Sequence, residues 1–244
     1  MNEVLLYFVL KYKGDWSAVY RAIIDHEQVD IKHVKKAISI VRCEYLTVAD
    51  QNYPKYFKRI NKPPFVLFYQ GDITNFEEKL ISLHGSLNTI NIQYLKILNE
   101  FGYVFIYALD HTNFADIKKM LTLNFKVNIY IPYGINNSYI KTVFRYMHDH
   151  TLIFSDAYEN RDTSTHSLQD IDKILLGHNN KVLFIGNDDY ESVKDKLDYC
   201  QREENTVYKI VCNNSIHANE SWSKDNIKII RNGEELHNAF VIKN

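Results

Sequence analysis

Residues 80–107 read LISLHGSLNTINIQYLKILNEFGYVFIY and set the pattern for the chain. The run Leu80–His84 is short and apolar, as in a strand that is buried on both faces. Ile90–Phe101 then places its apolar residues at helical spacing, and Tyr103–Tyr107 is again an apolar run of strand length. A strand, a helix and a strand in this order predict a βαβ unit with parallel strands.

The same alternation continues on both sides of this unit. Further strands are predicted at Phe65–Tyr69, Val127–Ile131, Thr151–Phe154, Lys181–Ile185, Val207–Val211 and Ile227–Ile230. Further helices are predicted at Phe114–Leu121, Ser138–Met147, Leu168–Leu176, Tyr190–Gln201 and Glu234–Phe240. Right-handed crossovers between such units give a fold of the α/β class, with a Rossmann-like, doubly wound, mostly parallel sheet. Ligands of these sheets bind beyond the carboxyl ends of the strands, so we expect the site in the loops after His84, Tyr107, Ile131 and Ile185.

The start of the chain has a different pattern. Residues 3–42 carry three groups of apolar side chains at helical spacing, and Asp15 and Asp30 stand where helix N-caps are expected. We therefore predict a small helical, SAM-like module at residues 1–50 and the Rossmann-like domain at residues 51–244. Two roles are open for the module: a docking or dimerisation appendage, or direct contact with a ligand.

Composition excludes several classes of protein. The 29 Lys and Arg against 30 Asp and Glu give a net charge of −1, so nucleic-acid binding requires a local patch rather than a basic tail. Only 8 of the 244 residues are Gly, which argues against glycine-rich nucleotide loops. Three cysteines are too few for a disulfide framework, and the apolar run Val4–Leu10 is too short to span a membrane. We expect a cytoplasmic protein with reduced thiols and no membrane partner.

The best phosphate candidate is the turn after Leu80–His84. Gly85 allows the backbone to approach a ligand closely, and Ser86 and Asn88 offer polar groups beside the free N–H groups of a helix start. The turn matches neither a dinucleotide fingerprint nor a phosphate-binding loop of Walker type. An ordinary turn with a capping Ser or Asn is the alternative.

No spacing in the chain predicts a catalytic set. His148 and His150 lack the helical spacing of a zinc motif, and no nucleophile elbow is present. His111 follows a predicted strand and could face a ligand, or it is an ordinary loop residue. Asp188 and Asp189 fit the start of a helix. We expect no metal, no cofactor and no enzymatic activity.

Two stretches mix basic and aromatic residues, as single-stranded nucleic acid requires of its binding groove. One is Tyr53–Arg59, and the other contains Tyr139, Lys141, Phe144 and Arg145. The alternative for both is a surface on which long basic side chains cover core aromatics.

Residues 52–72, NYPKYFKRINKPPFVLFYQGD, resemble a known family. They are similar to the first segment of the Rossmann-like domain in the DNA-processing protein A family (DprA, also called Smf). In that family the segment reads YP…L..I.DPP.VLFYKGN. The resemblance extends over nearly the whole chain, and fewer residues match after residue 85. Gly85 and Ser86 match the family's G-S-R, with Leu87 in place of the arginine.

The later family motifs are partly kept. Gly134 and Tyr139 match the family loop G-x-D-x-x-Y, and Lys141 falls where some members carry a lysine. Gly177 matches a glycine that follows the family's arginine-rich helix, in which Lys173 stands for the last arginine. His111 replaces the basic residue of a turn.

The resemblance implies a dimeric DNA-binding protein. Members hold single-stranded DNA in a basic pocket and help to load the recombinase RecA during DNA recombination in natural transformation (competence). The implied DNA and phosphate site consists of Gly85, Ser86, Asn88, His111, Gly134, Tyr139, Lys141, Arg145, Lys173 and Gly177. Replacing the family arginine by Leu87 removes a charge and a planar donor fork.

The leading hypothesis is therefore a divergent DprA-like protein, not an enzyme, that binds single-stranded DNA, a recombinase partner or both. One alternative is an interaction protein of the same fold that has lost DNA binding. The other is a nucleotide-processing enzyme of the lysine-decarboxylase-like (LOG) group, although that group's P-G-G-x-G-T signature is absent from the chain.

Overall fold

The structure is a computed structural model. It describes residues 2–87, 92–109, 113–137, 140–159, 168–177, 180–186, 188–211, 222 and 226–240.

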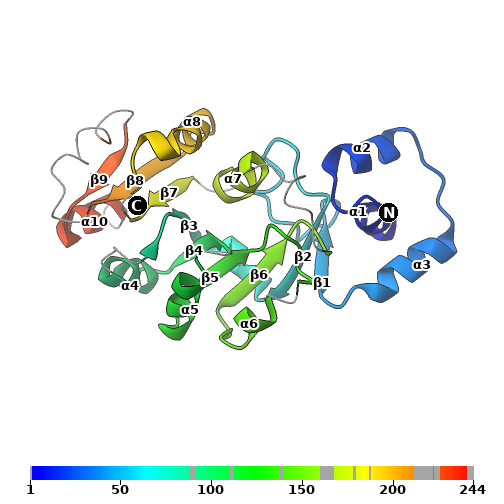
Figure 1. The fold of residues 1–244 in the computed structure, drawn as a ribbon, viewed down its shortest axis with the longest axis horizontal. Helices are drawn as coiled ribbons and strands as arrows, with labels where there is room; N and C mark the ends of the chain where they lie inside the picture. The colour runs from blue at the N-terminus through cyan, green and yellow to red at the C-terminus, as the bar shows by residue number, and fades with distance from the viewer. Residues whose placement is uncertain are drawn as a thin grey trace.

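Nine strands of the described residues form one sheet (Figure 1). They are β1 (Glu44–Thr47), β2 (Val66–Gly71), β3 (Lys79–His84), β4 (Tyr103–Ala108), β5 (Val127–Tyr130), β6 (Thr151–Ser155), β7 (Lys181–Phe184), β8 (Thr206–Ile210) and β9 (Lys228–Ile230). Their order is β1-β2-β6-β5-β4-β3-β7-β8-β9. The strands from β6 across to β9 are parallel, whereas β1 and β2 pair antiparallel at one edge. The predicted Rossmann-like α/β class is confirmed, and β1 is a strand that the sequence pattern did not predict.

The strand order reverses beside β3. The chain runs outward from β3 through β4, β5 and β6, then returns to place β7 on the other side of β3 and continues through β8 and β9. Ser82 of β3 is in register with Ile106 of β4 and with Val182 of β7. The carboxyl ends of β3 and β7 therefore form the switch point at which open α/β sheets bind their ligands.

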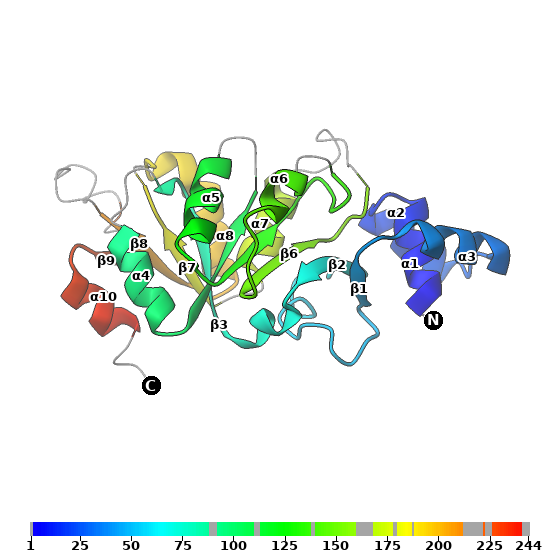
Figure 2. The same ribbon diagram turned by 90° about the horizontal axis from the view of Figure 1, so that it is seen from below.

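Helices cover both faces of the sheet (Figures 1 and 2). One face carries α4 (Ile92–Glu100), α5 (Phe114–Thr122), α6 (Ile140–Phe144) and α10 (Gly233–Phe240), and the other carries α7 (Leu168–Leu176) and α8 (Lys194–Arg202). Phe105 and Tyr107 of β4 are buried against the first set, while Val104 and Ile106 are buried against the second. This two-sided burial explains the continuous apolar runs of the sequence.

Two predicted helices differ in extent. The helix predicted at Ser138–Met147 is the shorter α6, because the chain turns after Phe144: the N–H of Tyr146 bonds Val143 and that of Met147 bonds Phe144. The helix predicted at Tyr190–Gln201 begins as a 3₁₀ turn, η3 (Glu191–Val193), before α8. A second 3₁₀ turn, η1 (Ile73–Glu77), connects β2 to β3.

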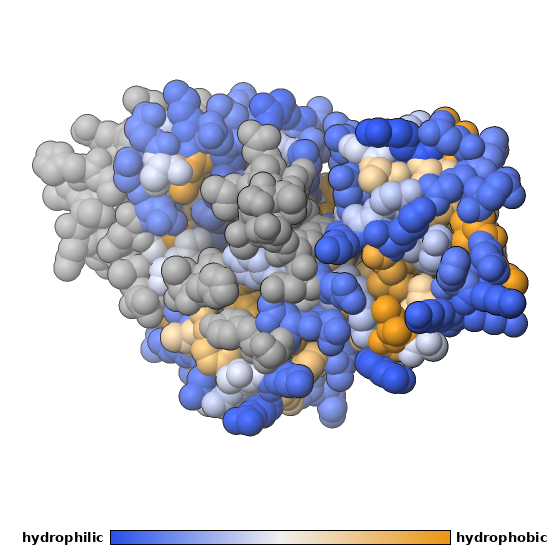
Figure 3. Space-filling view, turned by 45° about the vertical axis from the view of Figure 1, so that its right-hand side comes forward, coloured by the Kyte–Doolittle hydropathy of each residue, from blue (hydrophilic) through white to orange (hydrophobic). Residues whose placement is uncertain are grey.

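The helical module consists of α1 (Asn2–Lys11), α2 (Trp16–Ile24) and α3 (Ile31–Ile40). Both predicted N-caps are confirmed: Asp15 accepts from the N–H of Ala18, and Asp30 accepts from that of Lys32. Exposed large apolar side chains occur on this module at Val4, Tyr20, Ile24, Ile31 and Ile40. Figure 3 shows that hydrophilic residues divide its apolar surface into separate areas. No helix of the described residues is long and apolar enough to cross a membrane.

Trp16 joins the module to the rest of the protein. Its ring stacks on Tyr20 and on Phe65, with centroids 5.0 and 5.2 Å away, and its Nε1 donates to the carbonyl of Pro63 at 2.8 Å. The Nζ of Lys62 lies 5.6 Å from the Trp16 ring. A second link comes from Tyr158, whose hydroxyl donates to the carbonyl of Ile40. The module is thus fixed to the segment that leads into β2.

Trp16→Ala should loosen this joint. We expect a loss of about 2–4 kcal/mol in the free energy of unfolding, because a half-buried indole and its hydrogen bond disappear. Urea denaturation measures the loss, and limited proteolysis should show earlier cleavage between α3 and β1. Tyr20→Ala is the control, since it keeps the Pro63 bond and the Phe65 stack. Equal losses in the two variants would contradict the role given to Trp16.

Cys43 and Cys200 should be unreactive in the folded protein. Burial raises the pKa of each thiol to about 12. Because the thiolate is the nucleophile, only about one thiol in ten thousand is reactive at pH 8. Iodoacetamide at pH 8 should modify both residues only after unfolding, as read by peptide mass spectrometry. Labelling of either at the rate of free cysteine in the native protein would contradict the burial.

Candidate functional site

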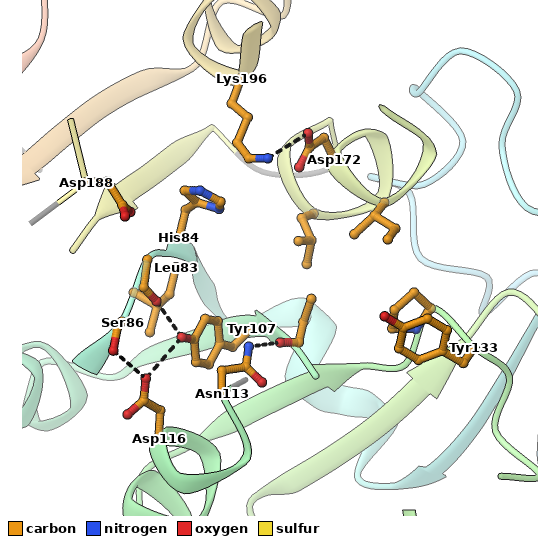
Figure 4. Close-up of a pocket in the computed structure, with 15 residues that line it drawn as sticks. Leu83, His84, Ser86, Tyr107, Asn113, Asp116, Tyr133, Asp172, Asp188 and Lys196 are labelled. Carbon is orange, nitrogen blue, oxygen red and sulfur yellow. Dashed lines mark hydrogen bonds and ion pairs between the residues drawn. The ribbon is translucent and has the colours of Figure 1, made fainter. Parts of the chain in front are cut away.

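A cavity of about 550 Å³ lies beyond the carboxyl ends of β3, β4 and β5 (Figure 4). Its lower wall comes from the ends of these strands and from the start of α5, and its upper wall comes from α7 and α8. Asp188, from the loop after β7, closes the side at the switch point. The loops that the sequence predicted as the binding region therefore do meet at one cavity.

Gly85 brings the loops after β3 and β7 together. Its φ is +105°, and a side chain there would overlap the carbonyl oxygen of Ile185 and lie 2.8 Å from Oδ2 of Asp188. The N–H of Ile185 donates to the carbonyl of His84 at 2.8 Å. The sequence predicted that Gly85 permits close approach to a ligand; in the structure, the close approach is to the neighbouring loop.

Asp116 holds the turn after Gly85. This carboxylate is buried in the first turn of α5, where helix N–H groups favour a negative charge. Its Oδ2 accepts from the N–H of Leu87 at 2.8 Å and from the hydroxyl of Ser86 at 3.2 Å. The hydroxyl of Tyr107 donates to the carbonyl of Gly85 and lies 3.5 Å from the same oxygen. Asp116 and Tyr107 together thereby fix residues 85–87 of the turn.

Leu87, which the resemblance aligns with an arginine, does not line the cavity. Its side chain is completely buried in the core between the sheet and α4 and α5. Its N–H faces Asp116 while its side chain packs inward. Position 87 therefore supplies an apolar core residue and no charge to this site.

The described walls of the cavity carry more negative than positive charge. Asp116, Asp172 and Asp188 face it, together with one cation, Lys196. The Nζ of Lys196 lies 3.2 Å from Oδ2 of Asp172 and is already paired. Burial raises the pKa of Asp172, and Lys196 only partly opposes that shift. Such a lining disfavours a phosphate inside the cavity.

The carboxylates do not form a metal site. Among the described residues, no group of three His, Cys, Asp or Glu side chains is arranged to hold a metal ion. Figure 4 shows Asp116, Asp172 and Asp188 on different sides of the cavity. They can accept hydrogen bonds from separate parts of one ligand.

The structure brings only some of the predicted site residues to this cavity. Gly85 and Ser86 line it, and Gly134 lies one residue beyond Tyr133, which lines it from the β5 side. Gly134 itself packs against the carbonyl of Glu159. Asn88, His111 and Tyr139 lie outside the described residues.

The predicted basic residues lie elsewhere. Lys141 and Arg145 are exposed on and just after α6, one helical turn apart. Lys173 lines a second cavity of about 360 Å³ on another side of α7, with Asp195, Asp198 and Glu203. Gly177 ends α7 beside the hydroxyl of Tyr199. Lys173 and Gly85 therefore do not share a cavity.

In the stretch Tyr53–Arg59, long basic side chains lie over core aromatic residues, which is the alternative expected from the sequence. Tyr53 and Phe57 are buried in the core, where the hydroxyl of Tyr53 donates to the carbonyl of Pro64 at 2.7 Å. The Nζ of Lys58 lies 5.7 Å from the Tyr53 ring. Tyr53 and Phe57 therefore stabilise the fold and offer no stacking platform, whereas Tyr56 is partly exposed, with the Arg59 guanidinium 6.0 Å from its ring.

Sequence reasoning missed most of the polar cavity walls. His84, Tyr107 and Asp188 lie in or next to the predicted loops, so the strand-end rule could have identified them. Asp172 and Lys196 come from the middle of α7 and the start of α8, and no local sequence signal links them to β3.

Comparison with known proteins agrees with this architecture. The sequence model of the family described as DNA recombination-mediator protein A matches residues 44–99. DNA processing protein A (DprA) from Streptococcus pneumoniae has a similar structure, with a TM-score of 0.65 and 16% identity over 97% of this chain and 92% of that chain. DNA processing protein A from Helicobacter pylori, for which a single-stranded DNA binding mode is described, has a TM-score of 0.60 and 15% identity over 81% of this chain and 96% of that chain. Comparison with curated proteins finds no match. The predicted resemblance to the DprA family is confirmed.

Gly85→Ala tests the contact at the switch point. We expect a loss of at least about 3 kcal/mol in the free energy of unfolding, because the positive φ and the overlap with Ile185 both oppose a side chain. Gly102→Ala is the matched control: its φ is +81°, and no atom lies within 4 Å of its added carbon. That variant should lose only about 1–2 kcal/mol. Equal losses by urea denaturation would contradict the contact.

Proposed function

We propose that this chain, which resembles the DprA family in sequence over residues 44–99 and in fold over nearly its whole length, is a DNA-processing protein that binds single-stranded DNA. One observation carries the proposal. The segment that matches the family includes β3 and the Gly85 turn, which contribute Leu83, His84, Gly85 and Ser86 to the lower wall of the cavity. The relative from Helicobacter pylori supports single-stranded DNA as the ligand class.

The charges favour a particular path for the strand. Lys141 and Arg145 are exposed on and just after α6, where solvent-exposed cations can contact phosphates. The carboxylates inside repel phosphates, but they accept hydrogen bonds from amino groups of bases. The ring of Tyr133, which lines the cavity from the loop after β5, is of the kind on which bases stack. In this arrangement the backbone runs over α6 and the bases point toward the cavity.

The remaining parts of the proposal rest on the resemblance. They are a binding role rather than catalysis, a homodimer, a recombinase of RecA type as partner, a setting in natural transformation, and a cytoplasmic location. Light scattering of the purified protein tests the dimer. Co-sedimentation with recombinase filaments on single-stranded DNA tests the partner.

An interaction protein without DNA binding is the second candidate function. It is favoured by the burial of Leu87 in place of an arginine and by the excess of carboxylates on the described cavity walls. A family fold with an acidic pocket could serve protein partners alone. DNA-binding measurements separate the two candidates.

Fluorescence anisotropy of a labelled oligo-dT over a salt series is the deciding measurement. If the strand crosses α6, Lys141→Ala should weaken binding by about 3- to 10-fold and lower the slope of log affinity against log salt by about 0.7, because one phosphate contact is lost. Lys79→Ala removes the same charge at the opposite end of β3 and should change neither quantity. Lys173→Ala should have a smaller effect than Lys141→Ala, because carboxylates outnumber the two cations, Lys173 and Arg202, in the lining of its cavity. Absence of binding at low salt would reject DNA binding and leave the interaction role.

A further inference from the structure

The cavity at the switch point has the size and lining of a ligand site. Its volume of about 550 Å³ lies within the range of small-molecule sites. Leu83 of β3 and Ile171 and Leu175 of α7 supply apolar surface, and Tyr107 and Tyr133 supply rings. Polar groups stand among them at several points of the wall. A mixed lining of this kind suits a flat ligand with polar edges.

The charged groups of the lining are mainly hydrogen-bond acceptors, and His84, Asn113 and Tyr133 add neutral groups that can donate or accept. Asp116 is occupied with the Gly85 turn, and Asp172 pairs with Lys196. Asp188 projects into the cavity from the switch-point side, and no hydrogen bond to its carboxylate is found among the described residues (Figure 4). Asp188 is therefore the acceptor that a ligand can use first. Asp172 offers a second carboxylate on another side of the cavity.

The charge and arrangement of these side chains restrict the ligands that the cavity can bind. Three carboxylates against one paired lysine repel a phosphate group. Their separation around the wall gives no metal site within the described part of the chain. A ligand that satisfies them must be uncharged or cationic, must donate N–H or O–H hydrogen bonds at separate points, and must have an apolar face.

We propose that this cavity binds the base and sugar of a single nucleoside and excludes its phosphate. The amino and hydroxyl groups of a nucleoside supply the donors, and its base supplies the flat face that Ile171, Leu175 and the tyrosine rings can contact. The nucleoside is either free or a unit of a strand whose phosphates stay outside. For the strand, this inference rests on the proposed function. For the free nucleoside, the inference depends only on the lining of the cavity and not on DNA binding.

Isothermal titration calorimetry of the full chain with cytidine and with cytidine 5′-monophosphate tests whether the cavity binds the nucleoside more tightly than its monophosphate. Cytidine should bind at least tenfold more tightly than the monophosphate. Asp188→Asn should reduce this ratio to less than threefold, because it removes a repelling charge and keeps the shape. Asp198→Asn, on α8 at the second cavity, makes the same change elsewhere and should leave the ratio unchanged. Thermal unfolding of both variants verifies that they are folded.

The outcomes separate this inference from the proposed function. Tighter binding of the monophosphate, no heat with cytidine at millimolar concentration, or an unchanged ratio in Asp188→Asn would each overturn the nucleoside site, even if oligo-dT still binds. Cytidine binding without oligo-dT binding would support the site and reject the DNA proposal. Where both bind, displacement of oligo-dT by cytidine assigns the site to a unit of the strand. Independent binding assigns it to the free nucleoside.

Discussion

The contact between the loops after β3 and β7 determines the arrangement of the functional end of the molecule. There the carbonyl of His84 accepts from the N–H of Ile185, and Gly85 lacks the side chain that would separate the two loops. Because β3 is the strand from which both halves of the sheet extend, this contact fixes the half built on β4 against the half built on β7. Asp188 and Asp116, one from each half, consequently face one cavity.

The burial of Leu87 and the position of Asp116 at the cavity have a common structural basis. The turn after Gly85 directs the side chain of Leu87 into the core and its N–H toward Asp116. Asp116 thus satisfies a buried backbone donor that would otherwise be costly. The Gly85 turn lies at the switch point where open α/β sheets bind ligands, while the described charges of the cavity favour hydrogen-bond donors. The position of the cavity therefore indicates where a ligand binds, whereas its charge indicates which chemical groups that ligand carries.

The sequence predicted the fold well where burial is two-sided and the site only in part. Continuous apolar runs located the parallel strands, and helix α7 was predicted to the residue at Leu168–Leu176. Strand β1 was missed because Glu44–Thr47 is a four-residue edge strand whose first residue is exposed, so its pattern is weak. The strand-end rule placed the cavity, but part of its charged lining, Asp172 and Lys196, comes from α7 and α8, and only the packing of these helices brings the two residues near β3. The family motif placed Lys173 in the site, and the structure turns it to another side of α7.

The position of β3 also has a consequence for how the chain folds. Ser82 pairs with Val182, a partner 100 residues later in the chain (182 − 82). During synthesis, β3 can pair with β4 soon after it emerges, but its other edge stays open until β7 has been made. Such long-range parallel pairing is slow and leaves an apolar strand edge exposed to association with other chains. The order of translation therefore makes closure at the centre of the sheet a late step, and this protein should depend on chaperones more than its modest size suggests.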